Sequence, residues 1–185
     1  MTGPDHFRAF LLSLGLDPAD DDQLAQTPAR VTALFEDLFA SVNQLAPAMS
    51  VFESDDATTG PIIISGIGFR SMCVHHLVPF FGTVDIAYLP ADHIAGFGSF
   101  GRIVDWAARK PQIQERMVAE IAEVLTEQIA PAGLLVRCRA RQLCVEMRSG
   151  RAGTYVSLAA SGALAAGGVH YDAVLQQLCA ADGAL

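Results

Sequence analysis

The sequence predicts an α+β fold in which an antiparallel β-sheet carries a pair of helices on one face. Two strand-like runs precede two helical segments, and two more strand-like runs follow them. That order places both helices on one face of a single sheet. The chain has 185 residues, of which 51% are hydrophobic and 17% are charged, as is typical of one ordered globular domain with a substantial core.

The N-terminal part, residues 1–42, is predicted to be a helical segment that precedes the main domain at residues 43–185. Its first helix is expected to end at Gly15. The second begins with Thr27 as the N-cap and Pro28 at the first helical position. Each helix has an apolar stripe, formed by Phe7, Phe10, Leu11 and Leu14 within residues 4–16 and by Val31, Leu34, Phe35 and Leu38 after Pro28.

The main domain begins with two strands and two helices. The strand "GTVDIAYLP" alternates between apolar and polar residues, and Pro90 ends it. Lys110 and Pro111 separate the two helices, and the second helix has an apolar residue at every fourth position. The expected elements are a loop at 43–60, strands at 61–70 and 79–89, helices at 99–109 and 111–130, a final strand pair, and a helix near 170–181.

The final strand pair is predicted from "LLVRCRARQLCVEMRS" and "AGTYVSLAAS", which are joined by a turn at Ser149 and Gly150. Side chains alternate between the two faces of a strand. If the whole segment "LLVRCRARQLCVEMRS" is one strand, one of its faces carries Arg137, Arg139 and Arg141. The other face carries Cys138, Ala140, Gln142, Cys144, Glu146 and Arg148.

Charge and hydropathy limit the class of partner. The net charge of −8 argues against a broad nucleic-acid surface and against an anionic membrane, so an anionic small molecule would need a local cluster of arginines. No apolar run reaches the length of about 18 residues that indicates a membrane span, and no leader pattern is present, so we expect a cytoplasmic protein. The four cysteines do not suggest a disulfide framework, and we expect free thiols.

A cysteine and two histidines in "SMCVHHL" form a candidate metal site. Cys73 and His76 are three residues apart, so a tight turn can direct both side chains to one point. A catalytic zinc ion has three protein ligands and keeps the fourth position for water. Cys144 is the candidate third ligand, on the strand face that also carries Gln142 and Arg148. Spacing alone leaves open the alternative of two buried cysteines and a turn histidine.

Several segments resemble the signature blocks of the GTP cyclohydrolase I family, in the same order, from about residue 16 to residue 162. The resemblance implies a tunnelling fold, in which antiparallel sheets of several subunits close into a barrel, and a toroidal homodecamer with active sites between subunits. The segments are "TPARV", "SMCVHHLVPFFGTVDIAYLP", "GRIVDWAARKPQIQERM" and "QLCVEMRS".

The resemblance also implies the chemistry. Members of the family hold one Zn²⁺ per site, and the matching ligands are Cys73, His76 and Cys144. The metal activates water for attack on C8 of the guanine of GTP, which opens the imidazole ring. A second hydrolysis then releases formate, and ribose rearrangement and ring closure give dihydroneopterin triphosphate.

Further residues match the family's functional positions. His75 matches an acid/base group near the purine, with a purely structural hydrogen bond in the turn as the alternative. Gln114 and Glu115 match residues that hold the guanine edge, for which a carboxylate is a suitable acceptor. Arginine binds phosphate through a bidentate fork, although each arginine taken alone is more often a surface charge. The arginines that match the triphosphate ligands are Arg30, Arg102 and Arg148.

The sequence departs from the family at functional positions. Val74 stands where the family usually has glutamate, and Gln142 stands at a catalytic position that is histidine in the family. Glutamine cannot exchange a proton near neutral pH, and losing a positioned acid/base group typically costs about 10²–10⁴-fold in the step that it serves. Gly98 and Ser99 replace a serine–lysine pair at the substrate site, so a substrate with fewer phosphates is conceivable, and the basic loop after the late strand is shortened to "SGRAG".

These observations predict a zinc-dependent cyclohydrolase that opens the imidazole ring of a guanine nucleotide or a related purine. Because the metal ligands are retained beside Gln142, the hypothesis includes a reaction that stops at the formylamino-pyrimidine stage. One alternative is an ordinary GTP cyclohydrolase I. Another is a non-catalytic paralogue that binds purines. A zinc nucleobase deaminase fits poorly, since its H-x-E and P-C-x-x-C motifs do not occur.

Overall fold

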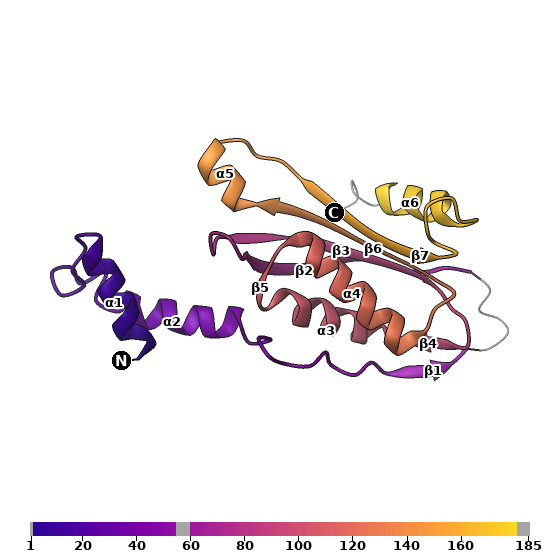
Figure 1. Ribbon diagram of the computed structural model, residues 1–185, viewed down its shortest axis with the longest axis horizontal. Coiled ribbons are helices and arrows are strands. Elements are labelled where there is room, and N and C mark those ends of the chain that lie inside the picture. Colours follow the sequence, from indigo (N-terminus) through magenta and orange to yellow (C-terminus); the bar gives the residue numbers. More distant parts are fainter. Residues whose placement is uncertain (1, 55–59, 181–185) are drawn as a thin grey trace.

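The computed structural model describes residues 2–54 and 60–180 and confirms the mixed α+β architecture (Figure 1). Its main sheet has five strands in the order β5-β2-β3-β6-β7, and all neighbouring pairs are antiparallel except β2 and β5, which are parallel. The strands are β2 (Ile62–Cys73), β3 (Pro79–Leu89), β5 (Pro111–Gln112), β6 (Gly133–Gln142) and β7 (Tyr155–Gly162).

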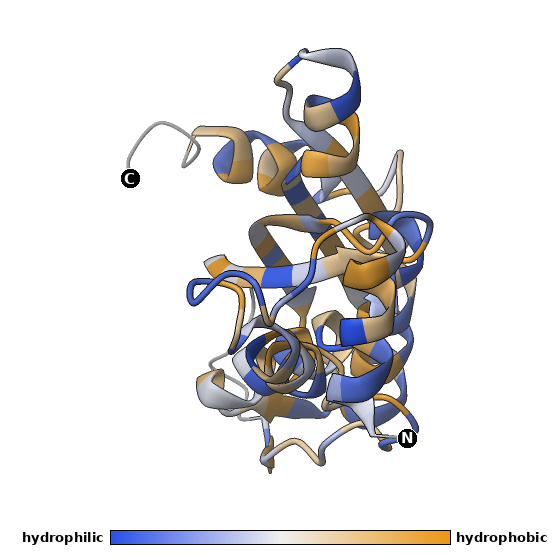
Figure 2. Ribbon diagram, turned by 90° about the vertical axis from the view of Figure 1, so that its left-hand side faces the viewer, coloured by the Kyte–Doolittle hydropathy of each residue, from blue (hydrophilic) through white to orange (hydrophobic). Residues whose placement is uncertain are grey.

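The helix pair α3 (Phe97–Ala108) and α4 (Gln114–Ile129) covers one face of this sheet (Figure 1). The four-residue repeat of α4 faces the strands, because all four of its later members are buried. Burying one such side chain contributes about 1.5–3 kcal/mol. Apolar and polar segments alternate along the helices in Figure 2, as expected for amphipathic helices. The buried residues of the repeat are Met117, Ile121, Leu125 and Ile129.

The predicted start of α4 is three residues too early. Pro111 and Gln112 form the short strand β5, which pairs in parallel with Met72 and Cys73 at the end of β2. Tertiary pairing therefore takes these residues out of the helix that their sequence pattern suggested, and Gln114 becomes the first helical residue.

The opposite face of the sheet has a smaller apolar cluster and a buried ion pair. Helix α6 (Tyr171–Ala180) contributes to this cluster, together with Ala87 and Leu135 of the sheet. The predicted helix ends at residue 181, which lies outside the described residues. The Arg137 guanidinium lies 3.5 Å from Asp85 on the neighbouring strand, and both side chains are buried. Arg137 therefore occupies the face that strand alternation predicted.

The N-terminal helices α1 (Gly3–Ser13) and α2 (Thr27–Leu38) pack against each other at one end of the molecule (Figure 1). Both predicted helices are confirmed. The predicted cap is wrong by one position, since Gln26 is the N-cap and Thr27 is already helical. The predicted loop at 43–60 contains the strand β1 (Val51–Glu53), which pairs with β4 (His93–Ala95), and its residues 55–59 lie outside the described part.

The predicted long late strand is wrong beyond residue 142. The chain instead forms the helix α5 (Leu143–Ser149), which Gly150 ends with a left-handed conformation at φ 67°. The cause is that the residues after Gln142 have no neighbouring strand to pair with. Gln142 pairs with Phe80 at the start of β3, and the pairing of β6 with β7 ends at Ala140. Residues beyond Gln142 therefore have no ladder to join and bond locally.

Within the described ranges, no helix combines the length and the apolar character that crossing a bilayer requires.

Candidate metal centre

Cys73 ends strand β2, and a tight turn leads from it into β3. The backbone N–H of Cys73 donates to the carbonyl of Val78 (2.9 Å), and the N–H of Leu77 donates to the carbonyl of Cys73 (2.8 Å). These bonds close the turn, bury Cys73 and leave His75 and His76 exposed. The turn has this form because it joins β2 and β3, which pair as antiparallel neighbours.

Leu77 takes an unusual conformation within the turn. Its φ of 48° lies in the left-handed region, which residues with a side chain rarely adopt. The Leu77 side chain lines an apolar groove of ≈ 540 Å³ together with Phe35 and Phe39 of α2. The turn is thus next to the N-terminal helices.

Strand β5 holds Cys73 from the other side. Gln112 pairs with Cys73, and its carbonyl accepts a hydrogen bond from the N–H of Val74 (2.9 Å). The fully buried Gln112 side chain donates to the carbonyl of Ala107 (3.0 Å) and to Glu120 (2.8 Å). Gln112 is not among the residues predicted from the sequence, where its only signal was Pro111, which interrupts the helical pattern.

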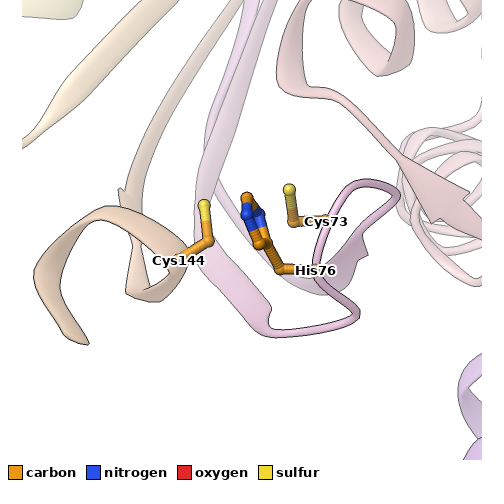
Figure 3. A group of neighbouring side chains, drawn as sticks. All are labelled: Cys73, His76 and Cys144. Carbon is orange, nitrogen blue, oxygen red and sulfur yellow. The ribbon is translucent and has the colours of Figure 1, made fainter. Parts of the chain in front are cut away.

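The structure brings the three predicted metal ligands together. One ligand atom each from Cys73, His76 and Cys144 lies within 4.8 Å of the other two. Figure 3 shows Cys144 on α5 beside Cys73 and His76, which come from the end of β2 and the following turn. In tetrahedral zinc sites with Zn–S and Zn–N bonds of about 2.3 and 2.1 Å, ligand atoms lie about 3.5–3.8 Å apart, so a small contraction suffices.

The donor set suits zinc. Two sulfur atoms and one imidazole are ligands that Zn²⁺ prefers, and three protein ligands leave a fourth position for water or substrate. Burial raises the pKa of Cys144, because it disfavours the charged thiolate. The adjacent Cys73 thiol raises it further, because two neighbouring thiolates repel each other. A divalent cation between them reverses this effect and favours the thiolates.

Cys144 reaches the group from the first turn of α5 rather than from a strand. The prediction that Cys144 lies on a strand face was therefore wrong, although the structure does bring Cys144 close to Cys73 and His76. The same correction applies to Glu146 and Arg148, which lie on α5. The Arg141 guanidinium pairs with Glu146 (2.6 Å) and so connects the end of β6 to this helix.

Each histidine contacts a different charged or polar neighbour. The Arg148 Nη1 lies 3.1 Å from Nε2 of His76, and Nδ1 of His75 lies 3.7 Å from the Cys73 sulfur. A guanidinium only donates hydrogen bonds, so Arg148 is the donor in any hydrogen bond with His76. The two imidazoles thus have different neighbours: His76 lies beside a cation, and His75 lies beside the Cys73 sulfur.

Two predicted site residues form a pair of amides beside the cluster. The Nε2 of Gln142 donates to Oε1 of Gln114 (2.8 Å). Gln114 is buried, and its own Nε2 donates to the carbonyls of Cys138 (3.2 Å) and Tyr155 (3.0 Å). Glu115, the next residue, is exposed in the first turn of α4. Of the two predicted guanine-binding residues, Glu115 is therefore the accessible one.

The predicted phosphate-binding residues are divided among three helices. Arg148 contacts His76, whereas Arg30 is exposed on α2 and Arg102 is exposed on α3. Arg102 donates to the hydroxyl of Ser99 (3.1 Å), which is buried and also accepts from the backbone N–H of Ser50 (3.1 Å). Among the described residues of one chain, Arg148 is thus the only one of these arginines with a recorded contact to the cysteine–histidine group.

Comparisons with known proteins agree on one family. The sequence model of GTP cyclohydrolase I matches residues 4–175. A GTP cyclohydrolase 1 of Thermobifida fusca is 38% identical over 148 residues, covering 78% of this chain and 70% of the relative. Proteins with the same name from Streptococcus agalactiae and Listeria monocytogenes are 38% and 36% identical, over 75% and 78% of this chain and 74% and 76% of their own lengths.

A solved structure, the archaeosine synthase QueF-Like in its apo form, aligns with a TM-score of 0.44 and 13% identity, over 57% of this chain and 96% of that chain. At that TM-score the likeness says nothing further about this chain.

Proposed function

Since this chain belongs to the GTP cyclohydrolase I family, we propose that it is a zinc-dependent cyclohydrolase that opens the imidazole ring of a guanine nucleotide. The observation that carries the proposal is the group of Cys73, His76 and Cys144, whose ligand atoms lie within 4.8 Å of one another. Zinc bound there would activate water for attack at C8 of the purine.

The chain's own residues would bind the substrate and move protons. Glu115 is exposed and offers a carboxylate that can accept from the N–H groups of a guanine edge. Arg148 offers a guanidinium for a phosphate beside the cluster, and Arg102 offers another from α3. His75, exposed next to Cys73, is suited to exchange a proton with the imidazole ring as it opens.

The point at which the reaction ends depends on position 142. An amide cannot exchange protons near neutral pH, so Gln142 favours a reaction that stops at the formylamino-pyrimidine. The complete reaction, to 7,8-dihydroneopterin triphosphate and formate, remains the second candidate. The 36–38% identity to proteins named GTP cyclohydrolase 1 favours it.

We also infer that the chain assembles with copies of itself, as a tunnelling-fold ring of the family's homodecameric type. The N-terminal segment, residues 1–42, exposes apolar side chains that include Phe10, Leu14 and Leu34 at 54%, 59% and 53%. Association with residues 43–185 of another copy would bury them. Arg30 could then contribute to a site whose metal ligands another copy supplies.

The test is to incubate the zinc-loaded protein with GTP and to follow the products by mass spectrometry and by assays for formate and neopterin. A product one water heavier than GTP, without formate, supports a reaction that stops after ring opening. Normal yields of formate and neopterin identify the complete reaction instead. A Cys144→Ala variant is the matched control, because it removes one candidate metal ligand at a half-buried position. A protein that binds no zinc and turns over no purine would be the non-catalytic paralogue.

A further inference from the structure

The amide pair of Gln114 and Gln142 has a fixed hydrogen-bond polarity. Both N–H groups of Gln114 are used by backbone carbonyls, those of Cys138 and Tyr155. If the Gln114 amide rotated by half a turn, its oxygen would face two carbonyl oxygens, which is unfavourable in a buried site. Gln114 therefore presents Oε1 to residue 142, and residue 142 must be a hydrogen-bond donor. Gln142 meets that requirement at 2.8 Å.

The pair connects the two chain segments that carry the cysteine ligands. Gln142 is the last residue of β6 and the N-cap residue of α5, and Cys144 follows two residues later. Its side chain makes no cap bond to α5, because it reaches Gln114 instead. Gln114 begins α4, two residues after Gln112, which pairs with Cys73. This side-chain hydrogen bond thus links the segments that hold Cys144 and Cys73, in addition to the contact of Arg148 with His76.

We propose that Gln142 is a positioning residue for the metal centre, acting through Gln114. The bond fixes the junction of β6 and α5 relative to the start of α4, and so keeps Cys144 close to Cys73 and His76 before a metal binds. The short helix α5 has no buried residues, and its other side-chain links include the Arg141–Glu146 pair to β6 and the contact of Arg148 with His76. This inference rests on the proposed function in one respect only, that the bound metal is zinc.

The role requires a donor at position 142, not a group that exchanges protons. Replacement with leucine removes the donor, and replacement with glutamate sets an acceptor against Oε1 of Gln114. Histidine retains a ring N–H in every protonation state and can restore the bond. The series Gln142→Leu, Gln142→Glu and Gln142→His therefore separates positioning from the bulk of the side chain.

Two measurements test the proposal. The first is the zinc dissociation constant, from competition with a chromogenic chelator. Loss of a residue that orients a metal ligand typically weakens binding by about 10–100-fold, and we expect this for Gln142→Leu and Gln142→Glu, with recovery to within about threefold in Gln142→His. The second is amide hydrogen exchange of residues 143–149 in the metal-free protein, which should speed up in the first two variants.

A matched control lies at the other end of α4. Gln128 also bonds backbone groups, since its oxygen accepts from the N–H of Met49 (2.7 Å) and its Nε2 donates to the carbonyl of Pro47 (3.2 Å). Gln128→Leu should lower the melting temperature and leave zinc affinity unchanged. A double variant, Gln114→Leu with Gln142→Leu, should bind zinc no more weakly than Gln114→Leu alone, because the same bond is already lost.

The outcomes are distinct. Unchanged zinc affinity and unchanged exchange in Gln142→Leu would overturn the proposal, as would equal losses in Gln142→His and Gln142→Glu. If the wild-type protein binds no zinc, the proposed function fails. Hydrogen exchange of α5 in the metal-free variants would then still decide whether the amide pair orders this helix.

Discussion

The guanidinium of Arg148 lies 3.1 Å from the imidazole nitrogen Nε2 of His76, so the last turn of α5 touches the turn that follows β2. Two segments separated by 72 positions in the chain meet at this contact, beside the cysteines. A permanent positive charge at this point favours the approach of anions.

We expect Arg148→Ala to raise the KM for GTP by about 10–100-fold, because a charged hydrogen bond contributes about 1.5–3 kcal/mol. Arg148→Lys should recover part of the loss, since lysine keeps the charge but not the fork. Steady-state kinetics with a parallel zinc determination would measure both effects. Arg8→Ala, on an exposed residue of α1 outside the cluster, is the control and should leave KM unchanged.

The four cysteines should differ in alkylation by iodoacetamide. Zinc should protect Cys144, a half-buried thiol, and chelation should restore its reactivity, whereas burial keeps Cys73 slow to react in either state. Burial, with the charges of Asp85 and Glu115, raises the pKa of Cys138 to about 12, so this thiol should stay unmodified at pH 8 with or without metal. Exposed Cys179 should react in both states. Peptide mass spectrometry gives the pattern, and equal labelling of Cys144 with and without zinc would contradict the metal site.

Gln142→His should move the reaction toward completion. An imidazole adds a group that exchanges protons near neutral pH, worth about 10²–10⁴-fold in the step that it serves. If the wild-type protein stops after ring opening, the variant should release formate and form neopterin. Product analysis under identical zinc loading measures this. A variant with the wild-type product ratio would show that residue 142 does not decide where the reaction ends.

The Arg141–Glu146 pair should make the protein sensitive to acid. The hydrogen bond and charge of Arg141 lower the pKa of Glu146. A carboxyl group with a lowered folded-state pKa stabilises the fold above its unfolded pKa of about 4.3, and this contribution is lost as the pH falls through the folded value. Melting temperatures from pH 7 to pH 3 should therefore fall less steeply for Glu146→Gln than for wild type. Glu127→Gln, on an exposed part of α4, should follow the wild-type curve.

Local patterns were sufficient for most of the secondary structure. The alternation before Pro90 and the four-residue repeat of α4 predicted a strand and a helix that the structure contains. The local patterns gave the wrong secondary structure where pairing with a neighbouring strand determines the conformation. Pro111 and Gln112 became a strand because β2 lies beside them, and residues after Gln142 left the sheet because no neighbouring strand continued.

The candidate site, too, was only partly predictable from local sequence patterns. The spacing of Cys73 and His76 predicted that their side chains point to the same place, and the structure brings Cys144 close to both. The bond between Gln114 and Gln142 was not predictable, because it joins residues 28 positions apart whose approach depends on how α4 packs on β6. Sequence spacing has no information on such packing.

Leu77 borders, from the turn that carries His75 and His76, the same groove as residues of α2. Its left-handed backbone, at φ 48°, costs about 1–2 kcal/mol that glycine would avoid, yet glycine would lose the side chain that lines the groove with Phe35 and Phe39. A displacement of α2 would therefore change the shape of a groove that the loop carrying His75 and His76 also borders.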